Sequence, residues 1–315
     1  MSERKKGRVV RADARVCHVD VEGEVRQYAL RGRLFEELDG GVKNPVTVGD
    51  WVLVGLDGDP PGIEEVLPRQ NYLSRVASSH DPREQVLFAN VDQLFVVGSV
   101  KKPRFSSNRA DRILAACFWH EIPGTLILNK VDLDRHEDAV AIRQTYERAG
   151  VQVLDTSATK GRGIEELRER LRDKVSVFYG ASGVGKSTLL NALQPGLGLR
   201  VGKISKYWEA GKHTTTFSKM HRLDSGGWVI DTPGIRVFRL HGLTKPHLRD
   251  LFPEFVPYQD GCRFPDCTHD HEPECGVFDA VEDGHIAPTR FASYLEMLDE
   301  VQPPPEEDVA VGEED

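Results

Sequence analysis

The chain has 315 residues, enough for two or three domains, and its 39% hydrophobic and 29% charged composition is that of a folded protein in water. It holds no apolar run of the roughly 18 residues that a membrane span needs, and the basic amino terminus leads into no apolar signal core. We therefore expect a cytoplasmic protein with no membrane partner. The net charge of −9 argues against a nucleic-acid partner, but residues 301–315 alone hold six acids, whereas segments 1–15 and 200–222 are basic.

The amino-terminal 75 residues are rich in Val and Leu that alternate with polar side chains, and turns rich in Gly, Asp and Pro divide them. This pattern predicts about five short strands. So many strands in so short a segment favour a small closed barrel, and we expect an OB-fold, although an SH3-like barrel would give nearly the same pattern. The expected strands lie within Arg8–Val21, Glu24–Leu34, Asp50–Leu56 and Ile63–Leu67.

From about residue 85, short apolar runs alternate with helical patterns, which predicts a doubly wound α/β domain with buried parallel strands. The expected strands are Val91–Val100, Gly124–Leu128, Val151–Leu154, Val175–Tyr179 and Trp228–Ile230. The expected helices are Asn108–His120, Glu137–Ala149, Ile164–Asp173 and Lys186–Leu193. Beyond about residue 245, short helices surround a cysteine cluster, and Phe291–Val301 is a last amphipathic helix.

The first motif that carries chemistry is Asn129-Lys130-Val131-Asp132, at the end of an expected strand. The Asp132 carboxylate can accept hydrogen bonds from both N1–H and the exocyclic amino group of guanine, and adenine offers neither donor there. Lys130 can lay its stem along the base, and Asn129 can fasten the loop. A polar helix cap is the alternative interpretation of this motif when it is taken alone.

A phosphate-binding loop lies between the strand that ends at Tyr179 and the helix that begins at Lys186. Its glycines let backbone N–H groups wrap the phosphates at the positive end of a helix. Lys186 should reach the β- and γ-phosphates, and the Ser187 hydroxyl should bind Mg²⁺. The spacing does not distinguish ATP from GTP. The loop comprises Gly180, Ala181, Ser182, Gly183, Val184, Gly185, Lys186, Ser187 and Thr188.

Two further segments fit the phosphate end of the same site. Asp231 ends an apolar strand and can hold the Mg²⁺ shell, and the N–H of Gly234 can sense the γ-phosphate. Before them, a basic stretch at 211–216 fits a mobile switch, in which any of three threonines could supply a hydroxyl to Mg²⁺. Ile235 follows Gly234 and cannot orient water, so His213 is the nearest candidate for that role.

The guanine-reading motif precedes the phosphate loop by about fifty residues. Between them, Ser157 and Ala158 follow another expected strand and fit a companion loop whose backbone N–H groups would read guanine O6. In the usual GTPase, the phosphate loop opens the domain and the guanine reader lies near its end. The inverted order therefore predicts a circularly permuted GTPase, in which the same fold has been cut and rejoined elsewhere.

Three of the five cysteines fall within one 14-residue segment together with two histidines. Three thiolates and an imidazole suit a closed tetrahedral Zn²⁺ site with no open position for catalysis, and metal binding would fold so short a segment. Cys262, Cys267 and Cys275 are the expected thiolate ligands, and on the residues alone either His269 or His271 could be the fourth. Free thiols beside a chance histidine are the alternative.

Together these motifs closely resemble the RsgA (YjeQ) family, the circularly permuted GTPases of small-ribosomal-subunit biogenesis. The resemblance runs from about residue 8 to 300 and rests on the inverted motif order and on three matching stretches, at 180–191, 213–216 and 262–275. It implies an OB-fold domain at 1–75, a permuted GTPase domain at 76–245, a mainly α zinc domain at 246–302 and an acidic tail at 303–315, which we expect to be disordered.

The resemblance also implies roles for particular residues. It makes His213 the catalytic histidine, acting next to the phosphate sensor Gly234, and Thr215 the switch threonine that binds Mg²⁺ beside Ser187 and Asp231. It selects His269 over His271 as the zinc ligand.

The activity that the resemblance implies is Mg²⁺-dependent hydrolysis of GTP to GDP, coupled to late maturation of the 30S subunit and stimulated by it. The flanking domains would contact 16S rRNA, one Zn²⁺ per chain would be structural, and a monomer is the simplest expectation. One alternative is an RNA-binding zinc protein that senses GTP with little turnover. Another is a GTPase of large-subunit assembly, although the barrel and the Cys₃His cluster point away from it.

Overall fold

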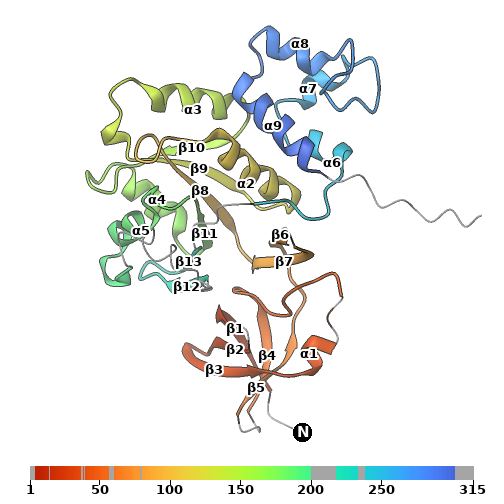
Figure 1. Ribbon diagram of the computed structural model, residues 1–315. Coiled ribbons are helices and arrows are strands. Elements are labelled where there is room, and N and C mark those ends of the chain that lie inside the picture. Colours follow the sequence, from red (N-terminus) through yellow and green to blue (C-terminus); the bar gives the residue numbers. More distant parts are fainter. Residues whose placement is uncertain are drawn as a thin grey trace, which may run out of the picture. The chain divides into compact units, whose positions relative to one another are not determined.

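The computed structural model describes residues 4–13, 15–36, 38, 40–56, 60–78, 80–199, 218–232 and 238–301 (Figure 1). The chain divides into two compact units, of which unit 1 ends at His241 and unit 2 begins at Gly242. Among the residues described, no helix is both long and apolar enough to cross a membrane.

Unit 1 begins with a closed barrel of five strands. The strand order is β1-β2-β3-β5-β4, and β1 pairs with both β2 and β4, which closes the barrel. All neighbours are antiparallel except β3 and β5. This arrangement confirms the expected OB-fold barrel. The strands are β1 (Arg4–Ala12), β2 (Val16–Val21), β3 (Glu24–Leu30), β4 (Trp51–Gly55) and β5 (Gly62–Val66), with the short helix α1 (Arg33–Glu36) after β3.

The barrel closes because alternate side chains of its strands point inward. Val19, Val52 and Ile63 are fully buried in its core. At Gly7 a Cβ atom would lie 2.5 Å from a methyl group of Val19, so a larger residue would not fit there without a shift of the barrel.

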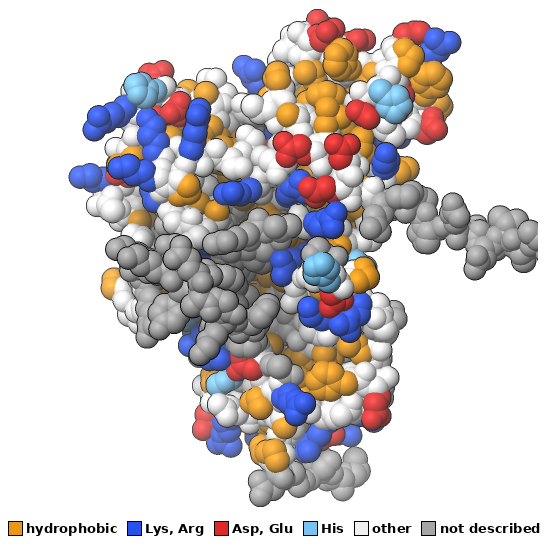
Figure 2. Space-filling view, viewed as in Figure 1, with side chains coloured by type: hydrophobic (Ala, Val, Ile, Leu, Met, Phe, Trp, Pro, Cys, Tyr) orange, Lys and Arg blue, Asp and Glu red, His pale blue; other side chains and the backbone are white. Residues whose placement is uncertain are grey.

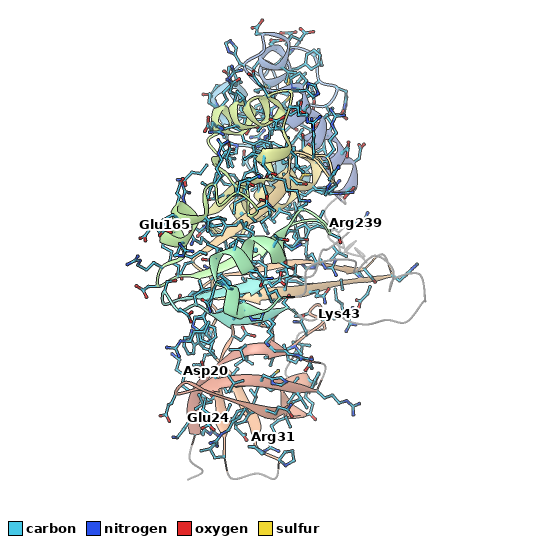
Figure 3. All side chains as sticks on the ribbon, turned by 90° about the vertical axis from the view of Figure 1, so that its left-hand side faces the viewer. Asp20, Glu24, Arg31, Lys43, Glu165 and Arg239 are labelled. Carbon is cyan, nitrogen blue, oxygen red and sulfur yellow. The ribbon has the colours of Figure 1, made fainter. Side chains whose placement is uncertain are left out.

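A two-stranded hairpin, which the sequence pattern did not predict, follows the barrel. It consists of β6 (Tyr72–Ser78) and β7 (Asp81–Ala89). The loop before β4 lies along it, where Lys43 N–H donates to the Glu84 carbonyl at 2.8 Å, and on its other side Val76 N–H donates to the Arg239 carbonyl at 2.9 Å. Lys43 and Arg239 flank the hairpin in Figure 3, while Asp20 and Glu24 mark β2 and β3 of the barrel and Arg31 follows directly after β3.

The α/β part of unit 1 is a twisted sheet in the order β10-β9-β8-β11-β13-β12. All neighbours are parallel except β12, a strand that the pattern also failed to predict. The strands are β8 (Gln93–Ser99), β9 (Gly124–Asn129), β10 (Gln152–Asp155), β11 (Val175–Tyr179), β12 (Lys219–Arg222) and β13 (Trp228–Asp231). β12 also pairs with β1 at Lys219 and Arg11, so the barrel strands continue the sheet.

Helices cover both faces of this sheet, as a doubly wound domain requires. Leu94 and Val96 of β8 point to the face of α2 (Ser107–Trp119) and α3 (Asp138–Arg148). The neighbouring Phe95 and Val97 point to the opposite face, which α4 (Ile164–Leu171) and α5 (Lys186–Leu193) cover. The four helices expected in this domain are all present, with ends shifted by at most two residues, whereas the expected last helix Phe291–Val301 begins three residues earlier, at Pro288. Two short 3₁₀ turns are η1 (Val131–Leu133) and η2 (Pro195–Leu197).

Unit 2 is a small helical body around an aromatic core. Phe252, Phe255 and Tyr294 are buried with ring centroids 5.1–5.4 Å apart. The buried Arg290 guanidinium binds both oxygens of Glu254, at 2.6 and 3.0 Å, and its charge is thereby paired. The helices are α6 (Lys245–Arg249), α7 (Val256–Gln259), α8 (Gly276–Glu282) and α9 (Pro288–Glu300).

Candidate nucleotide site and metal centre

The phosphate loop joins β11 to α5 in the strand–turn–helix context that its motif requires. A Cβ atom at Gly180 would lie 2.3 Å from the carbonyl oxygen of Val97 in β8, so glycine is needed where β11 leaves the sheet. Gly185 has φ of +100°, a left-handed value that glycine adopts at little cost, and the first residue of α5 follows it. The loop therefore wraps the amino end of α5, the position at which helices bind phosphate.

Lys186 is buried at the centre of this loop. Its Nζ donates to the carbonyls of Gly180 at 2.6 Å and Ala181 at 3.3 Å. Burial lowers the pKa of Lys186, and the charge of Asp231 partly opposes that shift. An ammonium held by carbonyl groups can exchange these bonds for phosphate oxygens without leaving its position. Ser182 is exposed in the loop, whereas Ser187 and Thr188 are half-buried in the first turn of α5.

Asp231 lies beside the phosphate loop because β13 pairs with β11, Phe178 opposite Asp231. Burial raises the pKa of Asp231, and Lys186 partly lowers it again. The next residue, Thr232, donates its hydroxyl to the Phe178 carbonyl at 2.8 Å, which fixes the end of β13. A carboxylate held so close to the loop lysine can bind water of a Mg²⁺ shell.

The guanine-reading motif begins where β9 ends, and Asn129 connects it to the phosphate loop. The Asn129 amide, which is buried, donates to the Val184 carbonyl at 3.0 Å. Its oxygen accepts from the Thr156 hydroxyl at 3.1 Å. Motifs that are 55 residues apart in sequence thus form one site.

Lys130 extends from the same motif toward the phosphate loop. It adopts φ of +61°, and its Nζ donates to the carbonyl of Gly183 at 2.6 Å and to that of Lys102. Desolvation lowers the pKa of Lys130, and Asp132 partly opposes this. The stem of Lys130 therefore spans the space between the two motifs, where a base would lie along it.

The exposed Asp132 meets the companion loop after β10. The Ser157 hydroxyl donates to a carboxylate oxygen of Asp132. The backbone N–H of Ser157 donates to the Arg162 carbonyl at 3.0 Å, so we expect Ala158 rather than Ser157 to read guanine O6. Val131 is buried and anchors the motif.

The loop after β8 is a part of the site that sequence reasoning missed. The Lys102 carbonyl holds Lys130, and the Ser99 hydroxyl donates to the Pro103 carbonyl at 2.7 Å. A Cβ at Gly183 would lie 3.7 Å from the Pro103 ring, so the loop borders the phosphate loop. The topology of the sheet could have indicated this loop. The chain leaves β8 toward β9 and leaves β11 toward β13 on the other side, and loops at such a topological switch point line the ligand crevice.

Three expected site residues, His213, Thr215 and Gly234, lie outside the described residues. Their catalytic and Mg²⁺-binding roles stay predictions.

The metal centre is in unit 2. The ligand atoms of Cys262, Cys267, His269 and Cys275 all lie within 4.8 Å of one another. His269 Nδ1 is 3.6 Å from Cys262 Sγ and 3.4 Å from Cys275 Sγ. His271 is exposed and contacts Asp270 instead, so the structure selects His269.

The chemistry of these donors fits a closed metal site. Burial raises the pKa of the Cys267 thiol to about 12, so a cation is needed to hold its thiolate. Three sulfur donors and one imidazole nitrogen leave no open position, which is typical of structural Zn²⁺. Glu272 shapes the loop between the ligands, since its carboxylate accepts from the N–H and hydroxyl of Thr268, both at 2.7 Å. The four residues can therefore hold one metal ion.

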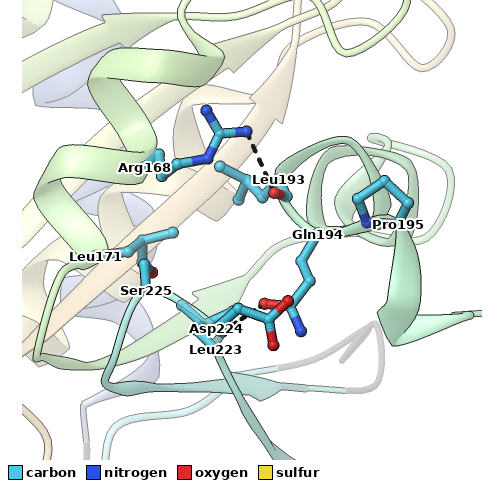
Figure 4. A pocket seen from close by; sticks show the side chains of 8 residues that line it. All are labelled: Arg168, Leu171, Leu193, Gln194, Pro195, Leu223, Asp224 and Ser225. Carbon is cyan, nitrogen blue, oxygen red and sulfur yellow. Dashed lines mark hydrogen bonds between the residues drawn. The ribbon is translucent and has the colours of Figure 1, made fainter.

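A hollow of about 360 Å³ lies elsewhere on unit 1 (Figure 4). Its walls come from the last turns of α4 and α5 and from the turn between β12 and β13, at the edge of the sheet opposite the phosphate loop. Across it Arg168 donates to the Leu193 carbonyl at 3.3 Å. The hollow is therefore not the nucleotide site. It is lined by Arg168, Leu171, Leu193, Gln194, Pro195, Leu223, Asp224 and Ser225.

Comparison with known proteins shows to which family the chain belongs. The family model described as RsgA GTPase matches residues 66–241, more than half of the chain. The chain belongs to the RsgA GTPase family. The small ribosomal subunit biogenesis GTPase RsgA of Caldanaerobacter subterraneus subsp. tengcongensis is 36% identical over 302 residues, which are 95% of this chain and 97% of that protein. That of Chlorobaculum tepidum is 46% identical over 217 residues, 69% and 70% of the two chains.

Solved structures agree with this assignment. The crystal structure of YjeQ from Thermotoga maritima has a TM-score of 0.73 at 36% identity and covers 95% of this chain and 99% of that one. The structure of YloQ, a circularly permuted GTPase, has a TM-score of 0.66 at 28% identity, with 96% and 97% covered. The predicted family, fold class and GTPase activity are confirmed. As a GTPase of the RsgA family, the protein carries its guanine-reading motif ahead of its phosphate loop.

Proposed function

We propose that this GTPase acts on the 30S ribosomal subunit in late maturation, binds its 16S rRNA and uses GTP hydrolysis to time its own release. The observation that carries the proposal is the connection of the guanine-reading motif to the phosphate loop through Asn129 and Lys130. The ribosomal role is supported by the printed names of the relatives that match nearly the whole chain. A cytoplasmic monomer is part of this proposal, as are domain limits at residues 75, 245 and 302.

The proposal assigns a role to each part of the site. Asp132 would accept from guanine, while backbone groups at Gly180–Thr188 and the Lys186 ammonium would hold the phosphates. When Mg²⁺ is bound with GTP, it supplies charge at the β- and γ-phosphates; its expected ligands are Ser187, Thr215 and Asp231. The further expectations are that His213 orients the attacking water, that Gly234 senses the γ-phosphate, and that the Cys₃His cluster holds one structural Zn²⁺.

Release of phosphate is the measurement that tests the proposal. GTP and ATP would each be incubated with the protein alone and with purified 30S subunits, 50S subunits or 70S ribosomes. We expect hydrolysis of GTP only, with strong stimulation by 30S subunits. Stimulation by 50S subunits alone would overturn the small-subunit assignment in favour of large-subunit assembly.

A GTP sensor with little turnover is the second candidate, and Ile235 is the observation that favours it, because this side chain cannot orient water. Hydrolysis by the native protein separates the two candidates, and the His213→Ala variant tests the role of His213. If 30S-stimulated hydrolysis is unchanged in this variant, His213 is not catalytic. If the native protein binds GTP without stimulated hydrolysis, the sensor is correct.

A further inference from the structure

Unit 2 exposes one apolar side chain on α7 and one on α8, and the surface of these two helices is called the α7–α8 face. Val256 in α7 is 51% exposed and Phe278 in α8 is 45% exposed. The two helices pack closely, since a Cβ at Gly276 would lie 2.4 Å from the Tyr258 carbonyl oxygen. The Phe278 ring packs edge-to-face with Phe291, with centroids 6.2 Å apart, and a little under half of the side chain is exposed. The exposed part of the Phe278 ring offers apolar area that a bound segment can cover.

The same unit is strongly acidic. Residues 242–301 carry thirteen acidic side chains and four basic ones, whereas residues 1–241 carry thirty-one acidic and thirty-seven basic ones. Structural contacts account for only part of these acids: Glu254 binds the buried Arg290, and Glu272 shapes the metal loop. Asp250, Asp270 and Glu274 lie beside a basic side chain or a histidine. Most of the others are exposed, and Figure 2 shows red and orange side chains next to one another over this unit.

Two acids at the end of α8 are placed where they destabilise the helix, whereas Asp279 lies in its first turn. Glu282 is the last residue of α8 and Asp283 is its C-cap, with no basic residue in the last turn. Negative charge at this end of a helix opposes the helix dipole, and Asp279 adds like charge one turn earlier. Among the described residues these three carboxylates form no ion pair. The position of Glu282 and Asp283 is therefore not explained by the stability of unit 2.

We propose that the α7–α8 face docks a lysine- and arginine-rich protein segment that also carries an apolar side chain. Its cations would meet Asp279, Glu282 and Asp283, and its apolar group would cover Phe278, whose ring also attracts guanidinium. RNA is disfavoured because its phosphates would meet like charge. The inference rests on the proposed function in one respect only. If the protein acts on the 30S subunit, which contains both RNA and basic proteins, we expect the α7–α8 face to bind a basic protein segment there.

The test uses the full, zinc-loaded chain and no ribosome, so its failure is distinct from failure of the proposed function. The probes are a fluorescent 20-residue peptide in which Lys or Arg alternates with Leu, and a 20-nucleotide single-stranded RNA. We expect the E282K/D283K variant to bind the peptide at least tenfold more weakly at low salt, and F278S to bind it several-fold more weakly. The matched control, E121K/E147K, changes the same charge on unit 1 and should bind like the native chain.

Thermal unfolding separates binding from folding. Lysine at the end of α8 favours the helix dipole, so E282K/D283K should unfold at the same or a higher temperature while it loses the peptide. If the control variant bound the peptide as weakly as E282K/D283K does, peptide binding would depend only on net charge, and the proposal would be overturned. So would RNA binding that F278S weakens, because the face would then recognise nucleic acid.

Discussion

The side-chain amide of Asn129 donates a 3.0 Å hydrogen bond to the carbonyl oxygen of Val184, 55 residues further along the chain. The same amide accepts from the hydroxyl of Thr156 in the companion loop. One buried side chain therefore positions the two guanine-reading segments relative to the phosphate loop. Rejoining the chain at a different point leaves this contact intact, because it depends on neighbouring strands of the sheet and not on their order in the sequence.

Replacing Asn129 with Ala should weaken binding of GTP and GDP roughly tenfold to a hundredfold, since two buried hydrogen bonds are lost at about 1 kcal/mol each. Titration with a fluorescent GDP analogue measures the change. Thr156→Val removes only one of the two bonds and should have a smaller effect. Unchanged affinity in both variants would mean that the two loops are held together by other contacts.

Replacing Asp132 with Asn should exchange the base that is bound. The carboxylate has two acceptor oxygens for guanine N1–H and its amino group, whereas the amide has one acceptor and one donor. The amide therefore matches xanthine, which presents N1–H beside a carbonyl at C2, so affinity should fall for GTP and rise for xanthosine triphosphate. Because mismatched polar groups in a base-reading site are strongly rejected, we expect a change of roughly a hundredfold or more. Competition between the two nucleotides measures it, and a variant that loses both equally contradicts the guanine-reading role.

His120 should make the stability of unit 1 depend on pH. Burial lowers the pKa of His120 to about 4, opposed by Glu84, while His241 lowers it further. The unfolded chain then binds the proton more tightly, so the free energy of unfolding should fall as pH drops from about 6.5 toward 4. Urea unfolding at pH 7 and pH 5 measures the loss, which we expect to be roughly 1–2 kcal/mol.

The His120→Gln variant is the control for this dependence. It cannot bind the proton, so its free energy of unfolding should fall less over the same pH range. If the native chain and the variant lose the same amount, other groups are responsible for the acid sensitivity.

Metal removal should unfold unit 2 and leave nucleotide binding in place, because the nucleotide loops lie wholly in unit 1. His269→Ala should lose tightly bound zinc and part of the helical circular dichroism signal. His271→Ala is the matched control and should retain both, since its imidazole is exposed. Zinc content by mass spectrometry and GDP affinity are the two readouts; zinc retained by His269→Ala would disprove the ligand assignment.

Local signals were sufficient for much of this protein. The phosphate loop was predictable because strand, glycine turn and helix are adjacent in sequence, and α5 begins and ends at the expected residues. Buried parallel strands were predictable because burial on both faces produces short, continuous apolar runs, as in β11. The hairpin of β6 and β7 was missed because its strands are polar and half-exposed. They are held in position by hydrogen bonds to the loop before β4 and to Arg239, which are distant in sequence.

The sequence by itself determined the chemistry of this protein: the guanine reader, the phosphate loop, their inverted order and the cysteine cluster each follow from residues that are neighbours in the chain. From the residues alone either His269 or His271 could complete the cluster; the family resemblance favoured His269, and the tertiary structure places it among the thiols. Only the tertiary structure added the Lys102 carbonyl to the site. The reason is physical. Residue type sets which bonds a group can make, whereas the partner it meets depends on the packing of segments far apart in the sequence.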